Sequence, residues 1–330
     1  MTTTLPLLGI RNLTIGFPAG KNRFLAVNDV SFNVQPGELV GVVGESGSGK
    51  SVTALAIMGL LPPTAVVSGE IAFEGRNIVG LPSRQLRALR GSRLGMIFQE
   101  PMTSLNPVFT VGDQITEAVR AHDRLSRRAA QERAVELLEK VGIPSPRRRL
   151  DDYPHQLSGG MRQRVMIAIA LSCSPKLLIA DEPTTALDVT IQAQLLDLLN
   201  DLRAEFGTAI VLITHNMGVM AEVADRVVVM YSSRVVEEAD IFDLFDRPQH
   251  PYTEGLLAST PDMDADARRL VTIPGGMPSP GSLPSGCLFA PRCPKAIEAC
   301  TLAQPPLIAL PGGQKAACIR APALVAEVRQ

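Results

Sequence analysis

The residues whose types and spacing could most clearly do chemistry form a glycine-rich run over residues 44–51. In this run a glycine is followed by four residues and then by Gly-Lys-Ser, which is the P-loop pattern. The candidate phosphate-binding residues are Gly44, Glu45, Ser46, Gly47, Ser48, Gly49, Lys50 and Ser51. The glycines let successive backbone N–H groups turn toward one anion, while Lys50 can reach the β- and γ-phosphates and Ser51 can hold Mg²⁺.

The flanking segments are those that a phosphate-binding loop requires. Residues 39–43 are all apolar or glycine and predict a buried parallel strand, and residues 52–61 predict a helix. A chance glycine-rich turn would not stand between such a strand and such a helix. The run therefore predicts a site for a nucleoside triphosphate.

An acidic pair follows a second apolar run. Residues 177–180 read Leu-Leu-Ile-Ala, as a strand buried on both faces does, and Asp181 and Glu182 come directly after them. Asp181 is a candidate Mg²⁺ ligand opposite the P-loop. Glu182 points elsewhere at a strand end and could orient or deprotonate an attacking water. The alternative is a purely structural, ion-paired acidic couple.

Two more polar residues end predicted strands. Gln99 follows the apolar residues 94–98, and His215 follows the buried strand predicted over residues 209–214. His215 could contact a γ-phosphate, but a lone histidine is more often structural. Neither residue carries a function without its context.

Four of the five cysteines lie close together near the end of the chain. Cys287, Cys293, Cys300 and Cys318 are separated by five, six and seventeen residues. Four thiolates can ligate Zn²⁺ or an iron–sulfur cluster. Structural zinc sites use tighter pairs of cysteines, so the wide gaps favour a cluster; zinc and unligated thiols are the alternatives.

The whole-chain properties restrict the class of protein. A length of 330 residues predicts about two domains. With 45% hydrophobic residues a large core is expected, and a net charge of −1 gives no reason to expect a nucleic-acid partner. The first ten residues do not resemble a signal peptide, and the apolar runs are too short to span a bilayer. We therefore expect a soluble chain whose membrane role, if any, comes through a partner.

The periodicity of the remaining segments predicts an α/β core with insertions. Residues 10–15 and 30–34 alternate as half-buried antiparallel strands do. Helices are expected over 110–122, from an N-cap at Ser126 to residue 141, and over 157–173, 191–206, 240–245 and 252–258; one or two strands are expected over 226–236. Ten of the 26 prolines fall within residues 261–311, where little regular structure is expected and the cysteines would have to hold the chain together.

The order of the motifs resembles that of the ATP-binding-cassette ATPases over about residues 7–260. The P-loop is followed by Gln99, Leu-Ser-Gly-Gly-Met at 157–161, Asp181-Glu182, Ala-Leu-Asp at 186–188, and His215. This resemblance implies a P-loop NTPase core with an antiparallel β subdomain and a helical subdomain. The predicted domains are a nucleotide-binding domain over 1–260, with the helical subdomain at about 103–172, and a small proline-rich, cysteine-containing extension over 261–330.

The resemblance also implies how the site works. Two chains would sandwich two ATP molecules, each held by one P-loop and by Ser158, Gly159 and Gly160 of the other chain. The catalytic residues would be Glu182, His215, Lys50 and Gln99. The Mg²⁺ ion would be held by Ser51, Asp181 and Gln99, and Asp188 would communicate across the dimer. An aromatic residue, Phe17 or Phe24, would stack on adenine.

Further motifs resemble those of the di- and oligopeptide importer ATPases: residues 98–107, 157–164, His-Pro-Tyr-Thr at 250–253, and the segment around Cys287 and Cys293. The departures are small, with Thr185 and Asn216 where serine and aspartate are usual. This resemblance implies ATP, Mg²⁺ and a [4Fe–4S] cluster as cofactors, and a place on the cytoplasmic face of the membrane. It implies as partners a related second ATPase subunit, two transmembrane permeases and an extracytoplasmic solute-binding protein.

Alternatives stay open on function and solute. The chain could be a soluble cassette ATPase unconnected to transport, or an iron–sulfur redox or sensor protein in which ATP hydrolysis is secondary. The solute could be a dipeptide, a longer peptide, a nickel complex or glutathione. The sequence does not distinguish a homodimer from a heterodimer.

Overall fold

The computed structural model describes residues 5–19, 22–99, 104–184, 189–259, 272–278 and 283–321. The chain forms two compact units that are interleaved along the sequence. The first unit comprises Met1–Leu7, Val34–Glu38 and Gly80–Ile213; the second comprises Leu8–Asn33, Leu39–Val79 and Thr214–Gln330. The division of the chain at residue 260 that the motifs predict stays a prediction.

The first unit contains three parallel strands in the order β6 (Leu94–Ile97), β7 (Leu177–Asp181) and β8 (Ala209–Thr214). Leu94 pairs with Leu177, and Leu177 with Ala209. All residues of the three strands are buried, which explains why their sequences are uninterrupted apolar runs rather than alternating ones. Helices α2 (Ser83–Leu89) and α8 (Val189–Phe206) belong to the same unit.

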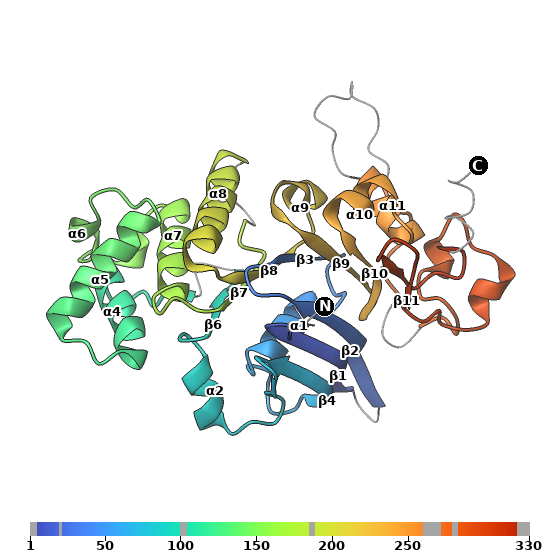
Figure 1. The fold of residues 1–330 in the computed structure, drawn as a ribbon, viewed down its shortest axis with the longest axis horizontal. Coiled ribbons are helices and arrows are strands. Elements are labelled where there is room, and N and C mark those ends of the chain that lie inside the picture. Colours follow the sequence, from blue (N-terminus) through green and yellow to red (C-terminus); the bar gives the residue numbers. More distant parts are fainter. Residues whose placement is uncertain are drawn as a thin grey trace. The chain divides into compact units, whose positions relative to one another are not determined.

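The helices predicted within residues 103–172 are present. They are α4 (Val111–His122), α5 (Arg127–Lys140) and α7 (Gly159–Ala170). A short helix, α6 (Pro146–Arg149), and a 3₁₀ turn, η1 (Pro154–Gln156), lie between α5 and α7 and were not predicted. Ser126 caps α5 as predicted, since its hydroxyl accepts a hydrogen bond from the Ala129 N–H at 3.2 Å. α4, α5 and α7 pack against one another (Figure 1).

The second unit has an antiparallel sheet near the N-terminus. Its order is β2 (Asn22–Val34), β1 (Leu8–Ala19), β4 (Val66–Phe73) and β5 (Arg76–Asn77) (Figure 1). The alternation at residues 10–15 and 30–34 correctly predicts β1 and β2, although both strands are longer than the segments that alternate.

Around the P-loop strand the same unit has a run of five strands in the order β3 (Leu39–Val43), β9 (Arg226–Tyr231), β10 (Arg234–Asp240), β12 (Lys315–Ala316) and β11 (Ile308–Ala309). Its helices are α1 (Lys50–Ile57), α9 (Met217–Val223), α10 (Ile241–Asp246) and α11 (Pro251–Ala258). Helix α1 is shorter than the predicted 52–61, because Gly59 turns to φ 62° and the Leu60 N–H closes back on the Leu55 carbonyl.

The extension has little regular structure among its described residues, as expected for residues 261–311, but it contains two short strands. β12 pairs with β10, with Glu237 opposite Ala316, so the extension adds strands to the sheet of the second unit. Of two 3₁₀ turns, η2 (Ala290–Arg292) directly precedes Cys293, and η3 (Glu298–Thr301) contains Cys300. A small buried cluster is formed by Leu310, Ala316 and Ala321. Backbone pairing and apolar burial therefore hold this segment in addition to whatever the cysteines do. No helix among the described residues is long and apolar enough to span a bilayer.

Candidate functional site

The P-loop backbone can be built only from glycine at its two ends. Gly44 has φ 151° and Gly49 has φ 102°. A Cβ atom on Gly44 would lie 2.1 Å from the Met230 carbonyl oxygen, and one on Gly49 would lie 2.5 Å from that of Ala26. Both approaches are closer than any side chain allows, so the neighbouring strands impose the glycine pattern that the sequence shows.

Lys50 begins α1 and its side chain is folded into the loop. It is 5% exposed, and its ammonium group donates to the carbonyls of Gly44 (2.6 Å) and Glu45 (2.9 Å). Ser51, the next residue, lies half-buried in the first turn of the helix. The loop therefore presents a cation and a helix N-terminus at the same point, which is the arrangement that binds phosphate groups.

The acidic pair lies at the carboxyl end of β7. Asp181 is the last residue of the strand and is 5% exposed. Glu182 takes a left-handed backbone conformation, with φ 46°, and its N–H donates to the Ile213 carbonyl at 2.9 Å. A non-glycine residue in this conformation costs free energy, and such residues cluster at functional sites.

Gln99 and Glu182 are brought together. The side-chain amide of Gln99 donates to Oε2 of Glu182 at 3.0 Å, although the two residues are 83 positions apart. The carboxyl ends of the adjacent strands β6 and β7 meet at one edge of the sheet, so the residues that follow them become neighbours. The bond gives Gln99, which is a weak candidate by itself, a direct contact with the acidic pair.

The other predicted residues lie at exposed element ends. His215 follows β8 and is exposed, and Asn216 caps α9 by accepting from the Gly218 N–H at 2.9 Å. Ser158 and Gly159 are exposed at the start of α7, where the Ser158 hydroxyl accepts from the Met161 N–H at 3.3 Å and Gly160 is half-buried. Asp188 lies outside the described residues, as do Thr185 and residues 100–103.

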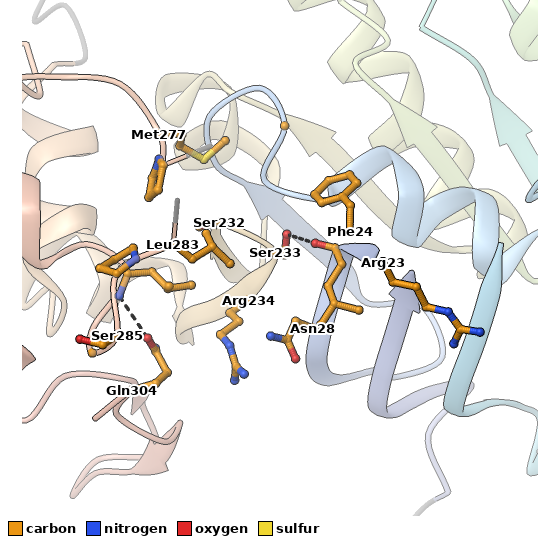
Figure 2. A pocket seen from close by; sticks show the side chains of 16 residues that line it. Arg23, Phe24, Asn28, Ser232, Ser233, Arg234, Met277, Leu283, Ser285 and Gln304 are labelled. Atoms are coloured by element: carbon orange, nitrogen blue, oxygen red, sulfur yellow. Dashed lines mark hydrogen bonds between the residues drawn. The ribbon is translucent and has the colours of Figure 1, made fainter. Parts of the chain in front are cut away.

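A cavity of about 370 Å³ adjoins the P-loop (Figure 2). Gly47 lines it together with Phe24 and Asn28 of β2 and the turn between β9 and β10. The extension supplies the remaining wall, with Met277, Leu283, Ser285 and Gln304 labelled in Figure 2. Phe17 is not among the lining residues. The structure therefore places Phe24, of the two candidate aromatic residues, beside the phosphate-binding loop.

The four cysteines of the extension line a second cavity. Cys300 is buried and the other three are half-buried, and all four are free thiols. Burial raises the pKa of the Cys287, Cys293 and Cys318 thiols. The thiol set fits a thiophilic metal or cluster chemically, but within the described residues no three His, Cys, Asp or Glu side chains are grouped closely enough to hold a metal ion. The predicted cluster is thus not shown.

Comparison with known proteins gives the family. The ABC transporter family model matches residues 27–185, and the model described as "Oligopeptide/dipeptide transporter, C-terminal region" matches residues 236–300. The oligopeptide transport ATP-binding protein AppD of Bacillus subtilis is 52% identical over 314 residues, covering 94% of this chain and 96% of AppD. OppD of Salmonella typhimurium is 50% identical, covering 95% and 93% of the two chains.

The chain belongs to the oligopeptide-type ABC transporter ATP-binding proteins.

Solved structures agree with this family at the level of the cassette. A dimeric post-hydrolysis structure of the ATP-binding cassette MJ0796, bound to ADP and Pi, has a TM-score of 0.65 and 30% identity. The matched region covers 71% of this chain and 98% of the MJ0796 chain. The predicted ABC ATPase fold and ATPase activity are confirmed by these matches.

The oligopeptide-type motif His-Pro-Tyr-Thr is buried beside the P-loop of this ABC protein. His250 is 1% exposed, and its Nδ1 accepts from the Tyr252 N–H at 3.1 Å; burial lowers the pKa of this imidazole to about 3, so the ring stays neutral. Burial likewise raises the pKa of Glu237 to about 7, although its carboxylate accepts from the backbone N–H groups of Gln249 and His250. The hydroxyl of Tyr252 accepts from the Glu45 N–H at 2.9 Å.

Sequence reasoning missed two residues of this ABC site. Tyr252 was recognised only as part of a subfamily motif, and Arg292 only as a neighbour of Cys293. Arg292 forms an ion pair with Glu45 of the P-loop, at 2.9 Å between Nη1 and Oε2. The available signal was chemical: an arginine among mostly apolar residues commonly pairs with an acidic side chain.

Proposed function

We propose that the chain is the ATP-hydrolysing subunit of an importer for peptides, and that it couples closure of an ATPase dimer to membrane permeases. The observation that carries this proposal is the similarity at about 50% identity to AppD and OppD, which extends through the cassette and the extension alike. Both relatives are named oligopeptide transport ATP-binding proteins. The P-loop alone would support any nucleoside triphosphatase.

In this proposal each ATP is held between two chains. Residues 44–51 bind the phosphates, Ser51, Gln99 and Asp181 serve Mg²⁺, and Phe24 contacts adenine. Glu182 orients and deprotonates the attacking water, with Gln99 holding one of its carboxylate oxygens, and His215 stabilises the γ-phosphate.

The second chain completes the site with Ser158, Gly159 and Gly160. The exposure of Ser158 and Gly159 at the start of a helix supports this role, because a partner can reach them. Asp188 communicates across the dimer.

The permeases dock near the segment that follows Gln99. Val108 is 71% exposed and Phe109 is 50% exposed, and Phe98 directly before Gln99 is 39% exposed. Large apolar side chains that are exposed close together in the chain are typical of protein interfaces. A permease bound there would act on Gln99, and through the bond to Glu182 on hydrolysis. The complex would place this chain on the cytoplasmic face of the membrane, with an extracytoplasmic binding protein supplying the solute.

This function is tested by purifying the affinity-tagged chain from detergent-solubilised membranes and identifying the proteins that accompany it. We expect two transmembrane permeases and a second ATPase subunit, and we expect cells that lack the gene to lose uptake of labelled di- to pentapeptides. Recovery of the tagged chain without permeases would favour the soluble-ATPase alternative. Loss of nickel or glutathione uptake, with peptide uptake intact, would reassign the solute.

The extension holds a [4Fe–4S] cluster on Cys287, Cys293, Cys300 and Cys318 in the same proposal. Support comes from the four free thiols of the extension, which all line one cavity. When bound, a cluster would join the loop around η2 to the segment that follows β12, which is otherwise held by short strands and a small apolar cluster.

Chemical analysis tests the cluster. We expect about four iron and four sulfide per chain after anaerobic purification, and complete loss of both in Cys300→Ser, whose thiol is the buried one. Cys173→Ser is the matched control, because Cys173 is a half-buried thiol of the first unit and should leave the iron content unchanged. One equivalent of zinc, or no metal in the wild type, would contradict the assignment.

A further inference from the structure

Arg292 of the extension is a buried arginine whose partner is in the P-loop. Its side chain is only 7% exposed, and its two terminal nitrogens donate to the two carboxylate oxygens of Glu45 at 2.9 and 3.0 Å. The two residues are 247 positions apart. A bidentate pair of this kind fixes orientation as well as distance, because two parallel hydrogen bonds prevent the carboxylate from rotating.

Glu45 is held through its main chain as well. Its N–H donates to the Tyr252 hydroxyl, and its carbonyl accepts from the Lys50 ammonium group at 2.9 Å. Both the main chain and the side chain of Glu45 are therefore held by hydrogen bonds. Tyr252 and Arg292 lie outside the P-loop, and Lys50 reaches across it. Of these partners, Arg292 alone bonds the Glu45 carboxylate, and it thereby offsets the negative charge that Glu45 brings into a loop whose proposed task is to bind an anion.

The extension in turn fixes Arg292. Its Nε donates to the Pro274 carbonyl at 2.9 Å, and the guanidinium lies 5.8 Å from the centre of the Tyr231 ring and 6.0 Å from that of Phe289. The rings of Tyr231, Tyr252 and Phe289 form one fully buried cluster. Nearby, the methyl group of Met277 is the first atom that a Cβ on Gly47 would meet, at 3.2 Å. The extension thus pairs with the loop at Glu45 and lies close to it at Gly47.

We propose that Arg292 is a positioning residue for nucleotide: it holds Glu45 and cancels its charge, so that the P-loop is ordered and electrostatically ready for the phosphates of ATP. The inference rests on the proposed role of residues 44–51 in binding ATP. It makes the extension a part of the nucleotide site rather than an appendage of the cassette.

The test is a titration of the full-length chain with a fluorescent ATP analogue. We expect Arg292→Ala to raise the Kd about tenfold, because Glu45 is left as an uncompensated negative charge beside the phosphates. Arg292→Lys should recover part of the loss. The double variant Arg292→Ala with Glu45→Gln should recover most of it, because removal of the carboxylate removes the repulsion; a purely structural role of Arg292 would not give this rescue.

Lys315→Ala is the matched control. Lys315 also joins the extension to the cassette, through an ion pair with Glu238 at 3.0 Å, but that pair does not contact the P-loop. We expect it to leave the Kd for the analogue unchanged. An Arg292→Ala Kd equal to that of the wild type overturns the inference, and so does a rise that the double variant does not relieve. If the wild type itself fails to bind the analogue, the proposed nucleotide site fails instead.

Discussion

Replacement of Glu182 by glutamine is expected to abolish ATP turnover while leaving ATP binding intact. Glutamine has almost the same shape and can still hydrogen-bond Gln99, but it cannot accept a proton from the attacking water. Loss of a general base costs about a hundredfold to ten-thousandfold in rate. The 3.0 Å hydrogen bond from Gln99 restrains the Glu182 carboxylate, as the positioning of a base requires.

The measurement is phosphate release by the assembled transporter, with nucleotide binding followed separately. Glu205→Gln is the control, because Glu205 is an exposed glutamate of the same unit that pairs with Lys140. It should hydrolyse ATP at the rate of the wild type. Normal turnover by Glu182→Gln would remove Glu182 from the chemistry and leave the acidic pair with a structural role.

Replacement of Lys50 by alanine is expected to remove nucleotide binding. The ammonium group is the one charged donor that the loop folds into its own interior, where it joins the carbonyls of Gly44 and Glu45. Its loss removes hydrogen bonds of a charged group to the phosphates, which contribute about 1.5–3 kcal/mol each, so we expect the Kd to rise about a hundredfold or more.

Titration with labelled ATP checks this expectation, and a thermal melt shows whether the loop change has unfolded the chain. Lys140→Ala serves as the control, since Lys140 is at the end of α5 in the other unit and pairs with Glu205. Binding by Lys50→Ala with the affinity of the wild type would refute the assignment of residues 44–51 as the phosphate site. Loss of binding in both variants would point to a general loss of structure.

The two predictions concern different units of the chain. Lys50 belongs to the second unit, with the extension, and Glu182 belongs to the first, with Gln99 and the exposed apolar residues that we assign to permease docking. The expected phenotypes separate accordingly: one variant fails to bind nucleotide, and the other binds it without turnover. The Arg292 variants should resemble a weak form of the first phenotype.

The sequence by itself determined the features that depend on a few consecutive residues. The P-loop follows from glycines whose positive φ angles no other residue takes as easily, and α5 follows from a serine cap and an apolar period. The apolar runs before Asp181 and His215 identify buried strands, because a strand covered on both faces has no polar side to alternate. These signals are local, so they can be recognised in the sequence without knowledge of the tertiary structure.

Only the tertiary structure decided which distant residues meet. Three contacts depend on how separate strands and loops are packed: Phe24 lines the cavity beside Gly47, Gln99 bonds Glu182, and Arg292 pairs with Glu45. The strand β12 is only two residues long, so it shows no alternation of apolar and polar residues. Its pairing with β10 therefore could not be predicted from the sequence. Contacts between residues far apart in the chain exist only after the chain has folded, because their geometry belongs to the packing and not to either local sequence.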